Sequence, residues 1–257
     1  MSELFARCRD EDRAALIGYL PVGFPSVQES VDAMLAMVEA GVDAVEVGVP
    51  YTDPGMDGPV IQAAVDAALR AGTRLRDTFL AVQAVAATGA PALVMTYWNP
   101  VERLGAERFA ADLAAAGGAG AITPDLIPEE ARPWVDAARR HGLDTVFLVA
   151  PSSTDERICV VGEVTRGFVY AASTMGVTGT RAQVGNRAEE LVARTRRLTD
   201  VPVAVGLGVS DGAQAAEVAR FADGVIVGSA LVRALGEGGV DAVRALSADL
   251  ADGVRRR

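Results

Sequence analysis

Short apolar runs alternate with amphipathic segments along the whole chain. Each run is rich in β-branched residues and leads into a glycine-rich loop, which precedes an alanine-rich segment with helical spacing. Continuous apolar runs are typical of parallel strands that are covered on both faces. The predicted strands are Ala15–Leu20, Ala44–Gly48, Ala92–Tyr97, Gly120–Thr123, Thr145–Val149, Gly167–Ala171, Val201–Val205 and Gly224–Val227.

The segments between these runs predict helices. Several end in a glycine, which supplies a left-handed cap, and an aspartate or glycine then leads into the next strand, as in Ala40-Gly41-Val42-Asp43. Residues 1–12 predict an extra helix in front of the first strand. The other predicted helices include Gln28–Ala40, Ile61–Ala71, Ala106–Ala116, Glu129–Arg140, Arg187–Leu198 and Ala213–Phe221.

Eight such units in 257 residues have the size of βαβ units. The absence of a composition break or linker favours one domain over residues 1–257, a closed (β/α)8 barrel. An open doubly wound sheet is the alternative, but it would normally carry a dinucleotide fingerprint after its first strand, and Leu20-Pro21-Val22-Gly23-Phe24-Pro25 is not one. We therefore expect an α/β protein with a single TIM barrel and an N-terminal helix at the barrel floor.

Composition narrows the possible chemistry. All 24 basic residues are arginine, and the lack of lysine excludes Schiff-base aldolases, pyridoxal phosphate enzymes and Walker A nucleotide sites. A single histidine and two distant cysteines leave almost no material for a metal site or a Ser-His-Asp triad. The net charge of −10 makes nucleic acid and anionic membranes poor partners. Without a signal region or a bilayer-spanning run, we expect a cytoplasmic protein.

Acidic residues occur at the end of the second predicted strand, where a barrel places its active site. Alternation directs Val45 and Val47 toward the helices and Glu46 into the barrel. Glutamate is seldom buried without a partner, so its presence here calls for an explanation. Taken alone, Glu46 is equally well interpreted as a catalytic acid or as a structural carboxylate paired with backbone amides or an arginine. The following loop adds Asp53, which favours turn chemistry, and Asp57, which is a second candidate acid or the start of a helix.

Glycine-rich segments follow the last three predicted strands. They are residues 173–180 (STMGVTGT), Gly206-Leu207-Gly208 and Gly228-Ser229. Loops after strands seven and eight, together with a helix N-terminus, form the usual phosphate site of such barrels from backbone N–H groups. A carboxylate pair that faces a phosphate site suits proton transfer on a phosphorylated carbon skeleton, although this pattern does not name the substrate.

Six segments in order resemble the alpha subunit of tryptophan synthase, and the resemblance covers essentially the whole chain. The most specific is residues 45–59, VEVGVPYTDPGMDGP, which is similar to the family signature L-E-(L/I/V)-G-x-P-(F/Y)-S-D-P-x-x-D-G-P. The others are residues 95–100 (MTYWNP), 124–130 (PDLIPEE), 176–179 (GVTG), 206–210 (GLGVS) and 228–230 (GSA).

The resemblance implies retro-aldol cleavage of indole-3-glycerol phosphate to indole and glyceraldehyde 3-phosphate, in the biosynthesis of L-tryptophan. Glu46 matches the catalytic glutamate, which takes the glycerol hydroxyl proton while indole C3 is protonated by the same group. Asp57 matches the aspartate that binds the indole N–H. The substrate pocket matches Tyr19, Ile61, Tyr97, Tyr170 and Thr178, and the phosphate site matches Gly179, Gly206, Gly208, Gly228 and Ser229. The chain departs from some members at Thr52, Thr174 and Leu207.

The resemblance also implies a partner, a pyridoxal phosphate beta subunit in an α2β2 heterotetramer, with no cofactor in this chain. We expect a lid from Thr174 to about Asn186 that the partner helps to order.

Other functions remain to be weighed. Indole-glycerol phosphate synthases and triosephosphate isomerases need a lysine that the chain lacks, and a phosphoribosylanthranilate isomerase needs a cysteine at the mouth, whereas Cys159 lies in a helix-like stretch. A stand-alone lyase that releases free indole stays open. So does a silent activating subunit, although retention of Glu46 and Asp57 argues against it.

Overall fold

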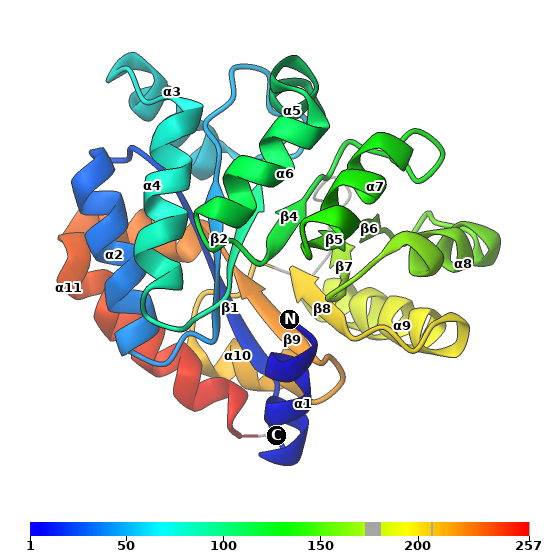
Figure 1. Ribbon diagram of the computed structural model, residues 1–257. Helices are drawn as coiled ribbons and strands as arrows, with labels where there is room; N and C mark the ends of the chain where they lie inside the picture. The colour runs from blue at the N-terminus through cyan, green and yellow to red at the C-terminus, as the bar shows by residue number, and fades with distance from the viewer. Residues whose placement is uncertain (173–180, 207, 257) are drawn as a thin grey trace.

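The computed structural model describes residues 1–257 except 173–180, 207 and 257, and except the side chains of 181–186. A ring of strands forms its centre and helices surround the ring (Figure 1). The strands are β1 (Ala15–Pro21), β2 (Ala44–Gly48), β3 (Ala92–Met95), β4 (Gly120–Ile122), β5 (Asp144–Val146), β6 (Leu148–Val149), β7 (Val169–Ala172), β8 (Val203–Gly206) and β9 (Gly224–Val227). The helices are α1 (Ser2–Asp10), α2 (Val27–Glu39), α3 (Pro59–Arg70), α4 (Leu75–Ala86), α5 (Trp98–Leu104), α6 (Ala106–Ala115), α7 (Arg132–Arg140), α8 (Asp155–Val164), α9 (Arg181–Leu198), α10 (Gly212–Ala219) and α11 (Ser229–Val254).

The ring closes through a strand that is interrupted once. Neighbouring strands follow the order β5-β4-β3-β2-β1-β9-β8-β7-β6, and every pairing in the described residues is parallel. Only Phe147 separates β5, which pairs with β4, from β6, which pairs with β7. The two pieces together correspond to the single predicted strand Thr145–Val149. The predicted α/β barrel is confirmed.

Element boundaries differ from the predicted ones mainly at prolines and turns. Strand β8 begins at Val203 and not at Val201, because Pro202 has no N–H for the strand ladder. Helix α7 begins at Arg132 and not at Glu129, with Pro133 in its first turn, where a missing N–H costs nothing. Strand β3 ends at Met95, two residues early, because Tyr97 is already the N-cap of α5.

Helix α1 fills the floor of the barrel. Its apolar side chains Leu4, Phe5 and Cys8 are buried against apolar residues inside the barrel, including Ile17 of β1 and Phe168, which directly precedes β7. The Phe5 and Phe168 rings are 5.7 Å apart between centroids. Figure 1 shows α1 at the foot of the barrel, beside both chain ends. The extra N-terminal helix is thus present as predicted.

Aspartates placed just before two strands tie the barrel floor together. Asp43 accepts a hydrogen bond from the Leu16 N–H at 2.9 Å and a bidentate pair from the buried Arg13 guanidinium at 2.7 and 2.8 Å. Asp223 accepts from the Val203 N–H at 2.8 Å and from Arg196 at 2.7 Å. Each carboxylate therefore joins its own strand to the neighbouring strand. Asp43, which the sequence predicted only as a turn residue, thus also links two neighbouring strands of the barrel.

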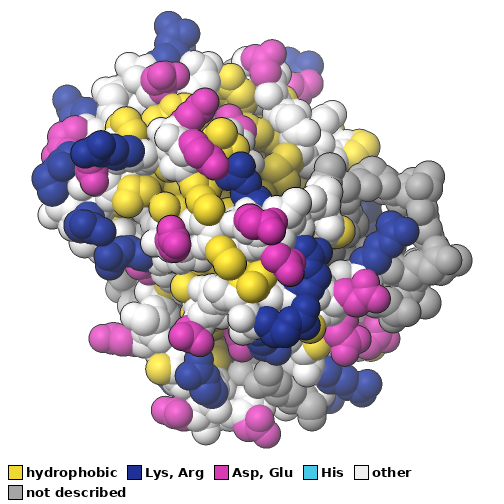
Figure 2. All heavy atoms as spheres, turned by 90° about the vertical axis from the view of Figure 1, so that its right-hand side faces the viewer, with side chains coloured by type: hydrophobic (Ala, Val, Ile, Leu, Met, Phe, Trp, Pro, Cys, Tyr) yellow, Lys and Arg dark blue, Asp and Glu magenta, His cyan; other side chains and the backbone are white. Residues whose placement is uncertain are grey.

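The described surface mixes charges of both signs. Figure 2 shows arginine and acidic side chains interspersed over one face, with apolar side chains between them. Large apolar side chains that are exposed include Met56, Leu80 and Ile127. No described helix combines the length and the apolar character that a bilayer crossing requires.

We expect Phe5→Ala to lower the free energy of unfolding by about 3–5 kcal/mol, because it removes a fully packed ring from the barrel floor. Urea denaturation measures this change. Leu80→Ala is the matched control: its side chain is 57% exposed, so a change within about 0.5 kcal/mol is expected. A loss below about 1 kcal/mol for Phe5→Ala would mean that α1 is not part of the core.

Candidate active site

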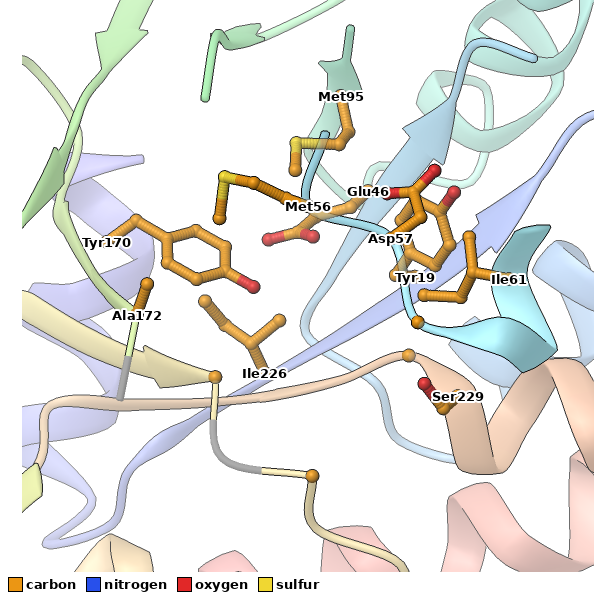
Figure 3. A pocket seen from close by; sticks show the side chains of 14 residues that line it. Tyr19, Glu46, Met56, Asp57, Ile61, Met95, Tyr170, Ala172, Ile226 and Ser229 are labelled. Carbon is orange, nitrogen blue, oxygen red and sulfur yellow. The ribbon is translucent and has the colours of Figure 1, made fainter. Parts of the chain in front are cut away.

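A cavity of about 380 Å³ opens at the carboxyl ends of the barrel strands (Figure 3). Its walls come from six strands, from the loop after β2 and from the starts of α3 and α11. Nine of the predicted site residues line it: Tyr19, Glu46, Asp57, Ile61, Tyr170, Gly206, Gly208, Gly228 and Ser229. The structure thus brings together residues that lie more than 200 positions apart in the chain.

Three predicted site residues are not among the described residues that line the cavity. Thr178 and Gly179 fall outside the described residues, as do Thr174 and Leu207 and most of the expected lid. Tyr97 is not among the residues that line the cavity, but its hydroxyl donates a hydrogen bond to Asp57, which does line it. Five lining residues were not predicted: Met56, Gly58, Met95, Ala172 and Ile226. Alternation could have found Met95 and Ile226, because they follow the inward-facing Leu93 and Gly224 by two positions.

Glu46 projects from the middle of β2 into the cavity. Its side chain is 1% exposed, and Oε1 has no hydrogen-bond partner among the described residues. Val45 and Val47 pack on the helix side, as alternation predicts. Burial raises the pKa of the Glu46 carboxyl to about 8, because an ion is poorly solvated there. The alternative of a structural carboxylate fully paired with amides or an arginine does not hold for Oε1 in the described part of the chain.

Asp57 lies at the end of the β2 loop, which we define as residues 49–58. Its Oδ1 accepts a hydrogen bond from the Tyr97 hydroxyl at 3.2 Å, and its carbonyl oxygen accepts from the Gln62 amide at 2.7 Å. Burial raises the pKa of the Asp57 carboxyl, while the Tyr97 hydrogen bond lowers it. The pKa of Asp57 is therefore less perturbed than that of Glu46, whose Oε1 has no such donor among the described residues.

Two tyrosines rest on glycines of neighbouring strands. A Cβ added to Gly48 would lie 2.6 Å from the Tyr19 hydroxyl, and a Cβ added to Gly206 would lie 2.6 Å from the Tyr170 hydroxyl. Any other residue at 48 or 206 would displace the tyrosine. Burial, reinforced by the nearby Glu46 and Asp57, raises the pKa of both tyrosines well above the usual value. Both hydroxyls are therefore neutral hydrogen-bond donors at physiological pH.

The far wall of the cavity is the N-terminus of α11. Gly228 is its N-cap and Ser229 its first residue, and both line the cavity. The first N–H groups of a helix have no internal partner and carry the positive end of its dipole, so they attract anions. Figure 3 shows Ser229 on one side of the open space, with the Glu46 carboxyl and the Tyr170 hydroxyl directed toward its middle.

The cavity thus combines a neutral buried acid, a second carboxyl group, apolar walls and an anion-binding helix end. Among the described residues, no group of three or more His, Cys, Asp or Glu side chains is placed to hold a metal ion. The fold and site define a (β/α)8-barrel enzyme of the general acid–base class, with room for an apolar ring that carries an anionic tail.

Comparison with known proteins identifies the family. The sequence profile of the tryptophan synthase alpha chain matches residues 5–252. The tryptophan synthase alpha chain of Mycolicibacterium paratuberculosis is 63% identical over 257 residues, which are 100% of this chain and 95% of the relative. A structure of Mycobacterium tuberculosis tryptophan synthase superposes with a TM-score of 0.94 at 61% identity, covering 98% of this chain and 97% of the other. The chain belongs to the tryptophan synthase alpha chain family.

The protein is accordingly a lyase that cleaves indole-3-glycerol phosphate in tryptophan biosynthesis, as the sequence resemblance implies. Alpha chains of the family use no cofactor of their own, since pyridoxal phosphate belongs to the beta chain. A more distant structure, titled as the α2β2 tryptophan synthase complex of Pyrococcus furiosus, has a TM-score of 0.85 at 38% identity, over 93% of this chain and 97% of the other.

We expect the buried Glu46 carboxyl to make stability depend on pH. Its folded-state pKa of about 8 is above the ordinary 4.5, so the folded protein holds this proton more tightly. The contribution of Glu46 to stability is therefore fully present below pH 4.5 and is lost as the pH rises toward 8. Glu46→Gln lacks this titration. The free energy of unfolding of Glu46→Gln, relative to that of the wild type, should therefore be about 3 kcal/mol higher at neutral pH than in acid.

Urea denaturation of both proteins across this pH range measures the effect. Glu237→Gln, on the exposed face of α11, controls for loss of a carboxylate that is not buried. Parallel stability curves for wild type and Glu46→Gln would show that Glu46 is solvated and not buried as described.

Proposed function

We propose that Glu46 and Asp57 perform the proton transfers of indole-3-glycerol phosphate cleavage in this chain. The observation that carries the proposal is the Glu46 carboxyl, which is buried in the cavity with Oε1 free of partners among the described residues. A buried polar atom without a partner costs free energy, and a substrate that supplies the partner removes this cost.

The reaction moves one proton and breaks one carbon–carbon bond. Indole C3 is a poor carbanion, so it must be protonated before the bond to the hydroxyl-bearing carbon breaks. The neutral Glu46 carboxyl donates this proton, and the ring becomes a cation. The bond electrons then restore the neutral indole while the hydroxyl becomes the aldehyde. The Glu46 carboxylate accepts the hydroxyl proton, so the enzyme returns to its starting state.

Asp57 is proposed to bind the indole N–H. Positive charge appears on the ring nitrogen only after C3 is protonated, so a carboxylate at this position stabilises the transition state more than the bound substrate. The hydrogen bond from Tyr97 supports this role, because it opposes the effect of burial and favours the ionised form of Asp57.

The remaining cavity residues are proposed to bind the substrate. Tyr19, Ile61 and Tyr170 would contact the indole and glycerol parts, together with Thr178 of the predicted set. Gly206, Gly208, Gly228 and Ser229, with Gly179, would hold the phosphate. The α11 N-terminus in the cavity wall supports this phosphate site. None of the described lining residues is an arginine, so backbone N–H groups would bind the anion.

Glu46→Gln should reduce kcat for indole release by about 10²–10⁴-fold, the usual contribution of general acid–base catalysis. Because the reaction needs the acid form of Glu46 and the ionised form of Asp57, kcat/KM of the wild type should have an acidic limb set by Asp57 and should fall as the pH rises through about 8. Steady-state assays with indole-3-glycerol phosphate measure both effects, with Glu237→Gln as control. Near-wild-type turnover in Glu46→Gln would refute the role. A rate that rises through pH 8 would mean that the carboxylate starts the reaction.

We also propose that the chain works with a tryptophan synthase beta subunit in an α2β2 assembly. The named α2β2 complex of Pyrococcus furiosus supports this, as do the exposed apolar side chains of Met56 and Ile127, which follow β2 and β4 at the cavity end of the barrel. A partner there would immobilise the β2 loop and so preorganise Asp57.

Addition of a purified beta chain should therefore raise kcat for cleavage by 5- to 150-fold, which corresponds to about 1–3 kcal/mol of coupling. Size-exclusion chromatography and indole assays on the same samples test this. An active chain whose rate is the same with and without the beta chain would be a stand-alone lyase, and a chain without any activity alone or in the complex would be a silent subunit.

We further infer a cytoplasmic location and a single domain over residues 1–257. The buried free thiol of Cys8 fits a reducing compartment. One sheet includes strands from the beginning and the end of the chain, which supports one folding unit.

A further inference from the structure

The Tyr97 hydroxyl contacts Asp57, which lines the cavity. The hydroxyl donates to Asp57 Oδ1 at 3.2 Å and accepts from the Met56 N–H at 2.9 Å. One hydroxyl group therefore binds two consecutive residues of the β2 loop. Burial raises the pKa of Tyr97 to about 12, so the hydroxyl stays protonated and can donate a hydrogen bond to a carboxylate.

The backbone around Tyr97 is fixed on both sides. The Thr96 hydroxyl donates to the Tyr97 carbonyl oxygen at 3.0 Å, and the Trp98 N–H donates to the Asp125 carboxylate at 2.9 and 3.1 Å. The Tyr97 ring also stacks on Tyr51, with centroids 5.3 Å apart. Tyr97 is thus a rigid support, held by the end of β3 and by the loop after β4.

The β2 loop has few other connections to the barrel. Within the described residues, the two ends of the loop, Val49 and Gly58, each make one backbone hydrogen bond to the rest of the protein, and positions 50–57 make four more. Two involve the Tyr97 hydroxyl, one joins the Asp57 carbonyl to Gln62, and one joins the Tyr51 hydroxyl to Asn99. Gly55 and Gly58 have nothing near an added Cβ, so the loop is not held by packing at these positions. The position of the Asp57 carboxylate therefore depends strongly on Tyr97.

We propose that Tyr97 is a positioning residue for the cleavage reaction, and that its hydroxyl holds the Asp57 carboxylate in the position from which it accepts the indole N–H. The proposal rests on the proposed role of Asp57. It differs from the expectation that Tyr97 lines the substrate pocket, since Tyr97 acts through Asp57. Substrate specificity follows as well: an ionised acceptor fixed at one wall favours ring systems that present an N–H over isosteres without one.

A double-mutant cycle tests whether Tyr97 acts through Asp57. We expect Tyr97→Phe to lower kcat for indole release by about 10- to 100-fold, the range for loss of a hydrogen bond to a charged group. In the Asp57→Asn background the same change should lower kcat by less than about twofold, because the group that it positions is gone. Tyr51→Phe is the matched comparison: it keeps the ring stack and removes a loop hydrogen bond that does not involve Asp57, so kcat should fall clearly less than in Tyr97→Phe.

Two further readouts separate positioning from general damage. Loss of the Tyr97 hydrogen bond raises the pKa of Asp57, so the acidic limb of the kcat/KM profile should move to higher pH in Tyr97→Phe. Binding of indole-3-propanol phosphate should weaken, whereas binding of its benzofuran counterpart, which lacks the N–H, should hardly change.

The possible outcomes distinguish the two proposals. Wild-type activity in Asp57→Asn would overturn the proposed role of Asp57, and with it this inference. If Asp57→Asn is strongly impaired and Tyr97→Phe lowers kcat by the same factor in that background as in the wild type, the two residues act independently. That result would overturn this inference but not the proposed role of Asp57. So would equal weakening of both analogues in Tyr97→Phe, since a merely structural role affects them alike.

Discussion

Burial of one carboxyl group on an apolar strand is the constraint on which the site depends. Glu46 can face inward only because the ring is closed and strand alternation sends Val45 and Val47 outward. The cavity around it is kept open by glycines that leave room for two tyrosine rings. The cost of holding a carboxyl group there is offset by packing at the other end of the barrel, where α1 seals the apolar interior. The residues that stabilise the barrel and those that line the reactive cavity thus lie at opposite ends of the strands.

The two ends of the barrel use acidic residues for opposite purposes. At the floor, Asp43 and Asp223 are saturated with hydrogen bonds and ion pairs, so their negative charge is matched and they join neighbouring strands. At the mouth, Glu46 Oε1 has no partner in the described structure and Asp57 has one side-chain donor, the Tyr97 hydroxyl. The same residue type is structural where its hydrogen bonds are satisfied, and available for reaction where they are not.

The sequence predicted the barrel and both acids because strand alternation and chain order are local properties. Glu46 was identifiable because a charged residue interrupts an apolar run. It did not predict that Phe147 divides one strand into two, nor that α7 starts at Arg132, since these depend on pairing and on proline geometry. The contact of Tyr97 with Asp57 also escaped prediction, because a hydroxyl 40 positions away is brought near only by the fold. For Gly206, the sequence suggested phosphate binding, while the room that it leaves for Tyr170 became visible only in three dimensions.

The seating of Tyr19 on Gly48 also limits how this barrel can evolve. Any side chain at position 48 collides with the Tyr19 ring, so a larger residue there is accessible only after position 19 has become smaller. The order of substitutions is therefore fixed, and the intermediate has an enlarged cavity beside Glu46. Lineages that take this route pass through a form with altered substrate fit, and the two positions should change together when diverged homologues are compared.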